Sequence, residues 1–305
     1  MSIFVKIMHN PLSENQKKHA TIGLVVLMAL CGLFAGCKSD TVSTPGGGAG
    51  NVGPVAGGAS GTDAIQGPTS FSAELQESVN EVPIMTQQFQ VRALDNNTGQ
   101  ALAGFETRSD ASSMVYFSNL PPGPVGFLVV GIPNESIDTY QFNIDSNEKN
   151  ETLWVVATSS VQMAPTLANV ILNPDKATAA GAIYWINPAT LEEEPVGCAT
   201  VRIDATEGEI RYFGSNNLPT TDTARADAQN QEVRTSTNPL NGKYYIANTS
   251  PGSHTVTMML NGQDMGSTTM MLFIGRESTD GQYSISISNI YVQNQSANPT
   301  PPGCM

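Results

Sequence analysis

Residues 242–260, GKYYIANTSPGSHTVTMML, indicate the fold of this chain more clearly than any other stretch. Two apolar runs, 243–247 and 254–260, flank the turn residues Ser250-Pro251-Gly252. Short alternating runs bounded by proline and glycine are typical of β-strands joined by a tight turn. Proline presets φ for such a turn, and glycine accepts a positive φ. The stretch therefore predicts two strands and a sharp reversal between them.

The same pattern continues on both sides of this stretch, at a spacing of roughly ten residues that is typical of β-sandwiches. Further strands are expected at 89–94, 114–117, 125–130, 154–157, 167–172, 182–186, 199–203, 269–274 and 283–292. Any helix should be short, and residues 70–79 are the best candidate. We therefore expect an all-β chain with two tandem Greek-key β-sandwiches, at residues 70–175 and 176–292.

Both halves repeat one order of turn motifs. In each, a strand runs into a polar turn, then an apolar segment, and later a proline-glycine turn before another strand. The segments are 95–99, 100–105 and 120–123 in the first half, and 187–190, 194–201, 242–246 and 250–256 in the second. This order resembles the carboxypeptidase regulatory-like, transthyretin-like domains, over most of residues 179–292. The resemblance implies a transthyretin-like or immunoglobulin-like sandwich for each half, although Ala111–Met114 replaces the family's G-x-Y/F motif in the first.

The N-terminal segment has the layout of a secretory signal peptide. Three lysines precede an uncharged apolar run from Ala20 to Gly36. The run ends in Leu33-Phe34-Ala35-Gly36-Cys37, which resembles the lipobox of bacterial lipoproteins. The resemblance implies that residues 1–36 are removed and that Cys37 carries a lipid anchor outside the cytoplasm. Lys38 occupies the position where Asp would signal inner-membrane retention, so the outer membrane is favoured.

A plain transmembrane helix over the same apolar run is the alternative interpretation. The run is near the lower limit of roughly 17 to 25 residues that span a bilayer, so its length does not decide. Residues 37–69 are rich in Gly, Ser, Thr and Pro, which is typical of a flexible tether behind a lipidated cysteine. We therefore favour the lipoprotein. Residues 293–305 form a Pro-rich C-terminal tail.

Charge limits the possible partners. The formal net charge is −13, and removal of residues 1–36 takes away three lysines and one glutamate, which leaves −15. Such a chain repels the phosphates of nucleic acids and anionic lipid headgroups. We therefore expect no nucleic-acid partner, contact with the membrane only through the lipid, and a protein or glycan as the binding partner.

Two cysteines remain available for a disulfide. Cys31 would leave with the signal peptide and Cys37 would carry lipid, so only Cys198 and Cys304 can pair. An oxidising compartment outside the cytoplasm permits this bond. The alternative is that Cys304, which lies next to the C-terminus, belongs to a free end.

The sequence offers little support for catalysis. His254 is the one histidine outside the signal segment, so a Ser-His-Asp site would need it, and no motif marks a serine. Carboxylates cluster at Glu192–Glu194, at Asp222 with Asp227, and at Asp204 with Glu207 and Glu209. They could form a calcium site or an acid-base pair, but none has EF-hand spacing. We expect solvated charges, no metal, no cofactor and no enzyme.

A binding surface is the remaining functional hypothesis. Tyr184, Trp185, Tyr244 and Tyr245 could line a platform for a sugar or peptide, although alternation places half of them in the core. The long segment 206–237 is a second candidate. The sequence thus favours a non-catalytic lipoprotein for binding, adhesion or envelope structure. Alternatives are a carbohydrate- or peptide-binding component of a surface uptake system and, less favoured, an enzyme that uses carboxylates without histidine.

Overall fold

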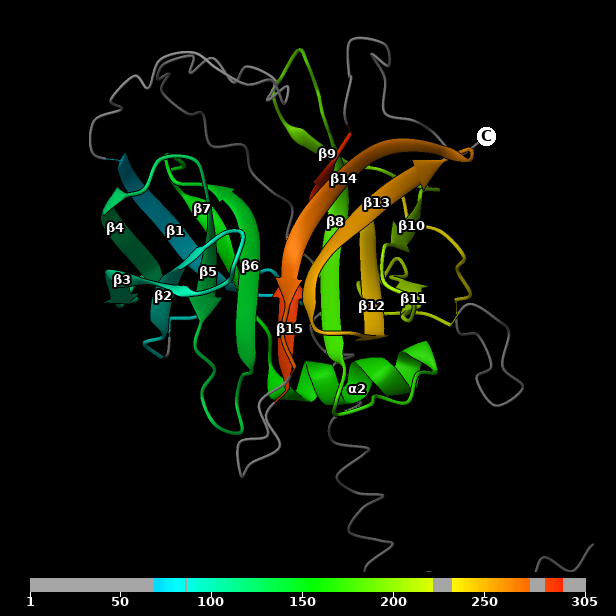
Figure 1. Cartoon of the computed structure of the whole chain (residues 1–305), viewed down its shortest axis with the longest axis horizontal. Coiled ribbons are helices and arrows are strands. Elements are labelled where there is room, and N and C mark those ends of the chain that lie inside the picture. The colour runs from blue at the N-terminus through cyan, green and yellow to red at the C-terminus, as the bar shows by residue number, and fades with distance from the viewer. Residues whose placement is uncertain (1–68, 86, 222–231, 275–282, 293–305) are drawn as a thin grey trace, which may run out of the picture. The chain divides into compact units, whose positions relative to one another are not determined.

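The computed structural model of the chain describes residues 69–85, 87–221, 232–274 and 283–292. Within these residues the chain is almost entirely β-strand, with one α-helix (Figure 1). This confirms the all-β expectation. None of the described helical residues form a segment long and apolar enough to cross a membrane. The elements of the first half are β1 (Thr69–Glu77), β2 (Gln90–Asp95), β3 (Ala101–Arg108), β4 (Met114–Leu120), β5 (Pro124–Val129), β6 (Asp138–Asp145), β7 (Glu151–Val155) and α2 (Thr158–Ala168).

Three sheets arrange the strands into layers. The elements of the second half are β8 (Ala177–Ile186), β9 (Glu193–Pro195), β10 (Thr200–Ile203), β11 (Glu209–Tyr212), β12 (Lys243–Thr249), β13 (Gly252–Leu260), β14 (Gln263–Leu272), β15 (Ser284–Ile287) and β16 (Ile290–Tyr291). The largest sheet runs in the order β11-β12-β8-β15-β6-β5-β2-β3, and β9 and β16 also pair with β8. Two smaller sheets, β4-β1-β7 and β10-β13-β14, complete the layers.

The first core lies between β4-β1-β7 and the β5 and β2 strands of the large sheet. Phe71 stacks on Phe127 with ring centroids 4.5 Å apart, and Phe117 lies 5.5 Å from the same ring. Phe71, Ala73 and Leu75 alternate along β1 and are at most 2% exposed. Packing of alternate residues between two sheets is the arrangement of a β-sandwich.

The second core lies between β10-β13-β14 and the β12 and β8 strands of the large sheet. Trp185 and Ile183 of β8 pack there with Met258 of β13 and Met270 of β14, all at most 2% exposed. Trp185 is one of the largest fully buried side chains in the described chain. Each half of the chain thus contributes one sandwich-like pair of layers.

Strand β15 joins the two halves into one sheet (Figure 1). It pairs in parallel with β6 on one side, from Ser284 opposite Asp138, and with β8 on the other, where Ser286 lies opposite Ala179. The described strands belong to one compact unit. The boundary between residues 175 and 176 therefore remains a prediction, and the two layer pairs share their largest sheet.

Two of the expected elements were wrong. Residues 70–79 are not a helix but form most of β1, because the alternation of apolar and polar residues in FSAELQ buries every second side chain. Residues 167–172 are not a strand. They contain the end of α2 and the coil behind it, where Asn169 adopts φ 55° and ends the helix.

Several strands carried no clear sequence signal. Every residue of edge strand β3 is at least partly exposed, so it lacks the buried stripe that marks a strand. Strand β6 buries the polar side chains of Thr139 and Gln141. Polar residues at the buried positions hide the apolar alternation by which a strand is predicted from sequence. Strand β11 lies inside the segment 206–237 that was read as an insertion, and residues 222–231 of that segment are outside the described residues.

The positive φ expected of Gly252 is confirmed, and the glycines of three other turn motifs share it. Gly99, Gly123, Gly242 and Gly252 have φ values of 67°, 99°, 60° and 124°. These positive φ values lie in the region that glycine adopts most readily, which suits the local reversal of the chain.

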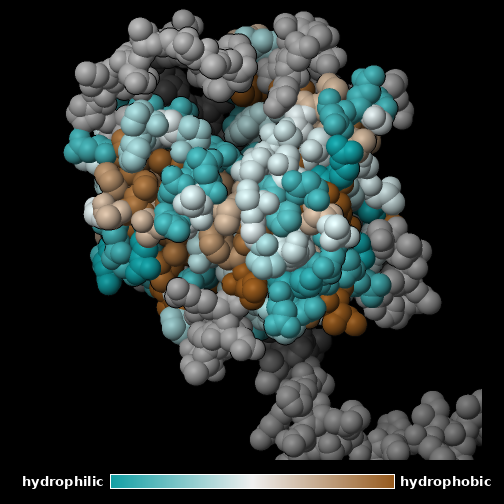
Figure 2. All heavy atoms as spheres, in the orientation of Figure 1, coloured by the Kyte–Doolittle hydropathy of each residue, from teal (hydrophilic) through white to brown (hydrophobic). Residues whose placement is uncertain are grey.

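The surface shows no broad apolar face in the view of Figure 2. Apolar residues appear there as separate patches between hydrophilic ones. Scattered apolar residues are normal for a folded surface. The apolar feature that stands out is instead a pocket formed by residues of the large sheet and of helix α2.

Candidate ligand pocket beside helix α2

The floor of the pocket is one face of the large sheet. Thr178, Ala180, Ala182 and Tyr184 line the pocket from alternate positions of β8, whereas the intervening residues include Ile183 and Trp185 of the second core. Side chains along a strand alternate between the two faces of a sheet. Strand β8 therefore serves the core with one face and the pocket with the other.

Helix α2 covers part of this pocket face. Near its start, Val161 packs with Val156 and with Ile285 of β15. At its end, Ala168 packs with Tyr245 and Ala247 of β12. The helix has no basic residue in its last turn, no acidic residue in its first turn and no side-chain cap at its start, so packing on the sheet is its principal support.

The two strands that flank β8 in the large sheet also line the pocket. Lys243 and Tyr245 of β12 lie on one side of β8, and Ile285 and Ile287 of β15 lie on the other. The space open to the centres of water-sized molecules is about 130 Å³. The remaining walls are formed by Ser78, Val79, Trp154, Val156, Ser160, Val161, Met163, Ala164, Leu167, Gly181, Phe213, Asn217, Leu218, Pro219, Tyr244, Ser284 and Asn289.

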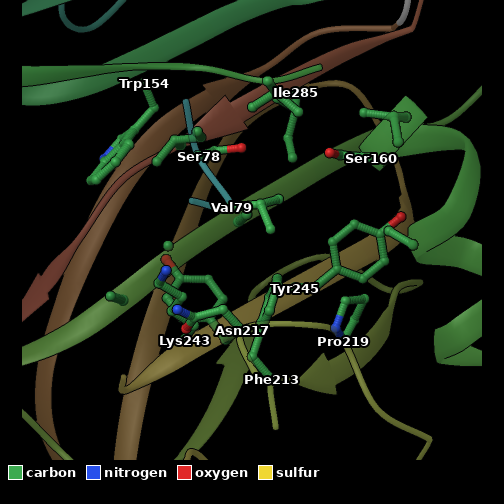
Figure 3. A pocket seen from close by; sticks show the side chains of 18 of the residues that line it. Ser78, Val79, Trp154, Ser160, Phe213, Asn217, Pro219, Lys243, Tyr245 and Ile285 are labelled. Atoms are coloured by element: carbon green, nitrogen blue, oxygen red, sulfur yellow. The ribbon is translucent and has the colours of Figure 1, made fainter. Parts of the chain in front are cut away.

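Side chains from distant parts of the sequence meet around this space (Figure 3). Trp154 belongs to β7, Ser160 to α2 and Phe213 to the segment after β11. Figure 3 shows the hydroxyl groups of Ser78 and Ser160 turned toward one another. The pocket therefore depends on tertiary packing of both halves of the chain.

The positive charge in the pocket lining is paired with a neighbouring carboxylate. Lys243 is the only charged residue that lines the described pocket, and its Nζ lies 2.8 Å from Oε1 of Glu81. Burial raises the pKa of Tyr184 and of Tyr245 to about 12, so both phenols are neutral at physiological pH. The nearby carboxylates of Glu193 and Glu81 add to the rise for Tyr184.

The pocket includes three of the four aromatic residues that the sequence suggested for a platform. Tyr184, Tyr244 and Tyr245 border it, but Tyr244 is fully buried and belongs with Trp185 to the second core. The hydroxyl of Tyr244 donates a hydrogen bond to the carbonyl of Ser288 at 2.7 Å. Burial raises the pKa of Tyr244 as well. Sequence reasoning missed Trp154 and Phe213, because only packing brings them near β8.

A Ser-His-Asp contact series lies elsewhere, at the turn between β12 and β13. Asp204 Oδ1 lies 2.8 Å from His254 Nδ1, and Oδ2 accepts the Thr255 N–H at 3.0 Å. Ser250 Oγ lies 3.4 Å from His254 Nε2. None of these residues lines the pocket. The contacts tie the end of β10 to the start of β13.

Asp204 is stabilised as a carboxylate. Partial burial by itself raises its pKa, but the hydrogen bonds from His254 and from the Thr255 N–H outweigh that effect and lower the pKa. Sequence reasoning named His254 and Asp204 separately. It missed Ser250, whose hydroxyl meets the imidazole because a Pro-Gly turn brings the two residues close.

The other carboxylate clusters do not converge on a metal site among the described residues. No group of three or more His, Cys, Asp or Glu side chains there could hold an ion. Glu207 instead pairs with Lys176 at 2.7 Å, and Glu209 with Arg211 at 3.2 Å. Glu193 accepts a hydrogen bond from Tyr291 at 2.7 Å. Asp222 and Asp227 lie outside the described residues.

The predicted lipidation and disulfide sites remain predictions. Cys37 and Cys304 both lie outside the described residues. Cys198 precedes β10 with φ 59°, and its N–H donates to the Thr237 carbonyl at 2.9 Å.

No protein-family model matches the chain. No curated protein matches it in sequence. Among solved structures, the TIE protein of Bacillus anthracis aligns over 74% of this chain and 34% of its own length, with 8% identity and a TM-score of 0.23. The chain thus spans about a third of that protein. A minor pilin of Streptococcus agalactiae aligns over 78% of this chain and 99% of its own, with 11% identity and a TM-score of 0.22. The shaft pilin of Lactobacillus rhamnosus GG aligns over 78% and 98%, with 10% identity and a TM-score of 0.21.

Proposed function

We propose that this chain is a non-catalytic binding module of the bacterial cell envelope, tethered by a lipid on Cys37. Its working part is the β-sheet assembly from Ser70 to Val292, and the pocket beside α2 is its ligand site. The tether at residues 37–69 would hold this assembly away from the membrane, and the outer membrane is the favoured location. The transthyretin-like character of the two halves belongs to the same proposal.

The observation that supports a binding role is the pocket itself. Ligand sites are concave and mostly apolar, with a few polar groups that orient the ligand. The pocket beside α2 has this composition, with Ser78, Ser160 and Asn217 among its polar residues. A core without a ligand role would normally fill such a space with larger side chains.

A carbohydrate- or peptide-binding role is the second candidate, because Tyr184 and Tyr245 line the pocket. Tyrosine offers both an apolar ring and a hydrogen-bonding hydroxyl, which suits sugars and peptides. A glycan array distinguishes the two roles. Saturable binding of one glycan class that is lost when the pocket is blocked would favour the carbohydrate role.

The test uses the full chain, expressed in a bacterial host and purified from its envelope in mild detergent. Native mass spectrometry should show a bound small molecule that Ala180→Phe removes, because the phenyl ring fills the pocket. The matched control is Ala101→Phe, in the exposed start of edge strand β3. An absence of any pocket-dependent adduct, together with no pocket-dependent glycan binding, would contradict the binding role.

The lipid anchor has a separate test. Metabolic labelling with a fatty-acid analogue should mark the wild type and leave Cys37→Ser unlabelled. Persistent labelling of the variant would contradict the lipoprotein assignment without affecting the pocket.

A further inference from the structure

We propose that the pocket beside α2 binds a single small, uncharged, ring-containing molecule. This inference rests on the proposed binding function and names the chemical class of its ligand. Three properties of the pocket carry it: its size, its balanced charge and the aromatic side chains around it.

Size limits the ligand to a compact molecule. One water-sized sphere occupies roughly 10 to 15 Å³. The centres of such spheres can move over about 130 Å³ in this pocket, so a ligand of about ten non-hydrogen atoms fits within it. A fused two-ring compound has this size. An extended glycan or a peptide of several residues would be accommodated only in part.

Charge excludes a strongly ionic ligand. The ammonium group of Lys243 already contacts Glu81, and its side chain is only 19% exposed. An anionic ligand would have to displace Glu81, and a cationic one would meet no carboxylate among the lining residues. A charge moved into this mostly apolar space would lose hydration without a compensating partner. An uncharged ligand avoids both costs.

Aromatic side chains favour a ring over an alkyl chain. Trp154, Tyr184, Phe213 and Tyr245 come from four separate segments and border the same space. Pairs of aromatic rings in offset or edge-to-face contact contribute roughly 0.5 to 1.5 kcal/mol beyond the area they bury. A ring-containing ligand can use several of these faces at once, whereas a flexible chain loses more conformational freedom on binding.

Polar groups provide orientation for one hydrogen-bonding group on the ligand. Ser78 and Ser160 line the pocket, and Figure 3 shows their hydroxyls directed toward one another. A hydroxyl or carbonyl on the ligand can bond to such groups without introducing charge. The inferred ligand is therefore a compact ring system with one neutral polar group.

The experiment measures binding of 1-naphthol to the full chain by titration calorimetry. Two comparison ligands of similar size are 1-naphthoate, which is charged, and 1-decanol, which has no ring. We expect saturable 1:1 binding of 1-naphthol and at least tenfold weaker binding of both comparison ligands. Ala180→Phe should abolish the binding, and Ala101→Phe should leave it unchanged.

Any result that differs from this expectation contradicts part or all of the inference. Equal binding of 1-naphthoate would refute the charge argument, and tighter binding of 1-decanol would identify an alkyl chain as the ligand class. If Ala180→Phe does not fold, Ser160→Trp blocks the pocket from the helix side instead. A failure of 1-naphthol to bind, while native mass spectrometry still shows a pocket-dependent adduct, would reject this ligand class and leave the binding function intact.

Discussion

At the scale of single residues, close backbone packing sets the geometry of the pocket floor. Gly181 lies in the middle of β8, where a Cβ atom would collide with the carbonyl oxygen of Ser288 and with the ring of Tyr244. The Tyr244 hydroxyl is bonded to that same carbonyl. Glycine is required here by the close approach of another backbone and not by a turn.

Gly181→Ala should therefore destabilise the protein by about 1 to 3 kcal/mol, the usual cost of forcing extra atoms into a packed core. Ala180→Ser is the matched control, because the neighbouring residue points into the pocket and has room for one more atom. Urea unfolding measures both free energies. Equal stability of Gly181→Ala and wild type would show that β8 and the Ser288 segment can separate at little cost.

Asp204 predicts a pH dependence of stability. Its pKa is lowered in the folded state, so its contribution is present above the unfolded pKa, near 3.8, and is lost as the pH falls through the lower folded value. The unfolding free energy of wild type should thus fall more steeply below about pH 4 than that of Asp204→Asn. Chemical unfolding at pH 3 and pH 6 tests this. Parallel pH profiles would show that the His254 and Thr255 contacts do not stabilise the fold.

At the scale of elements, β15 is the strand on which the two halves depend. It lies inside the large sheet, with β6 on one side and β8 on the other. Its neighbours belong to the first and second halves of the chain, so loss of its ladder would expose the edges of both.

Ser286→Pro should disrupt that ladder, since proline removes a backbone donor and is not tolerated in an interior strand. We expect a loss of about 3 kcal/mol or more and a decrease in melting temperature. Ala103→Pro, in the irregular part of edge strand β3, should cost less. Hydrogen exchange of β5 and β12 checks whether both halves loosen together. Loosening confined to the second half would favour two independent sandwich domains.

At the scale of the whole molecule, a bond between Cys198 and Cys304 would attach the C-terminal tail near the start of β10. Closing so long a loop stabilises a fold by up to about 4 to 5 kcal/mol in the chain-entropy model. A non-reduced digest should show the two cysteine peptides joined, and reduction should lower the melting temperature. Free thiols on both residues in protein taken from the native envelope would show that the tail is a free end.

Some properties of this protein are determined by its sequence alone. Local alternation and turn chemistry are encoded within a few residues, which is why the strands around Gly242–Leu260 and the positive-φ glycines were predictable. The expectation that nucleic acid is not a partner rests on net charge alone, and it stays a prediction. The failures at residues 70–79 and 167–172 arose where the periodicity was short or interrupted, so strand and helix were hard to tell apart.

Other properties were decided only by the tertiary structure. The alanines of β8 line a pocket only because α2, Trp154 and Phe213 come from other segments of the chain to border the same space. Likewise, β15 pairs with β6 across the two halves, and Ser250 meets His254 and Asp204 across a turn. The physical reason is that each of these features depends on contacts between residues far apart in the chain. The secondary-structure propensity of a short segment carries no information about such contacts. The partners meet only when the sheets pack into layers.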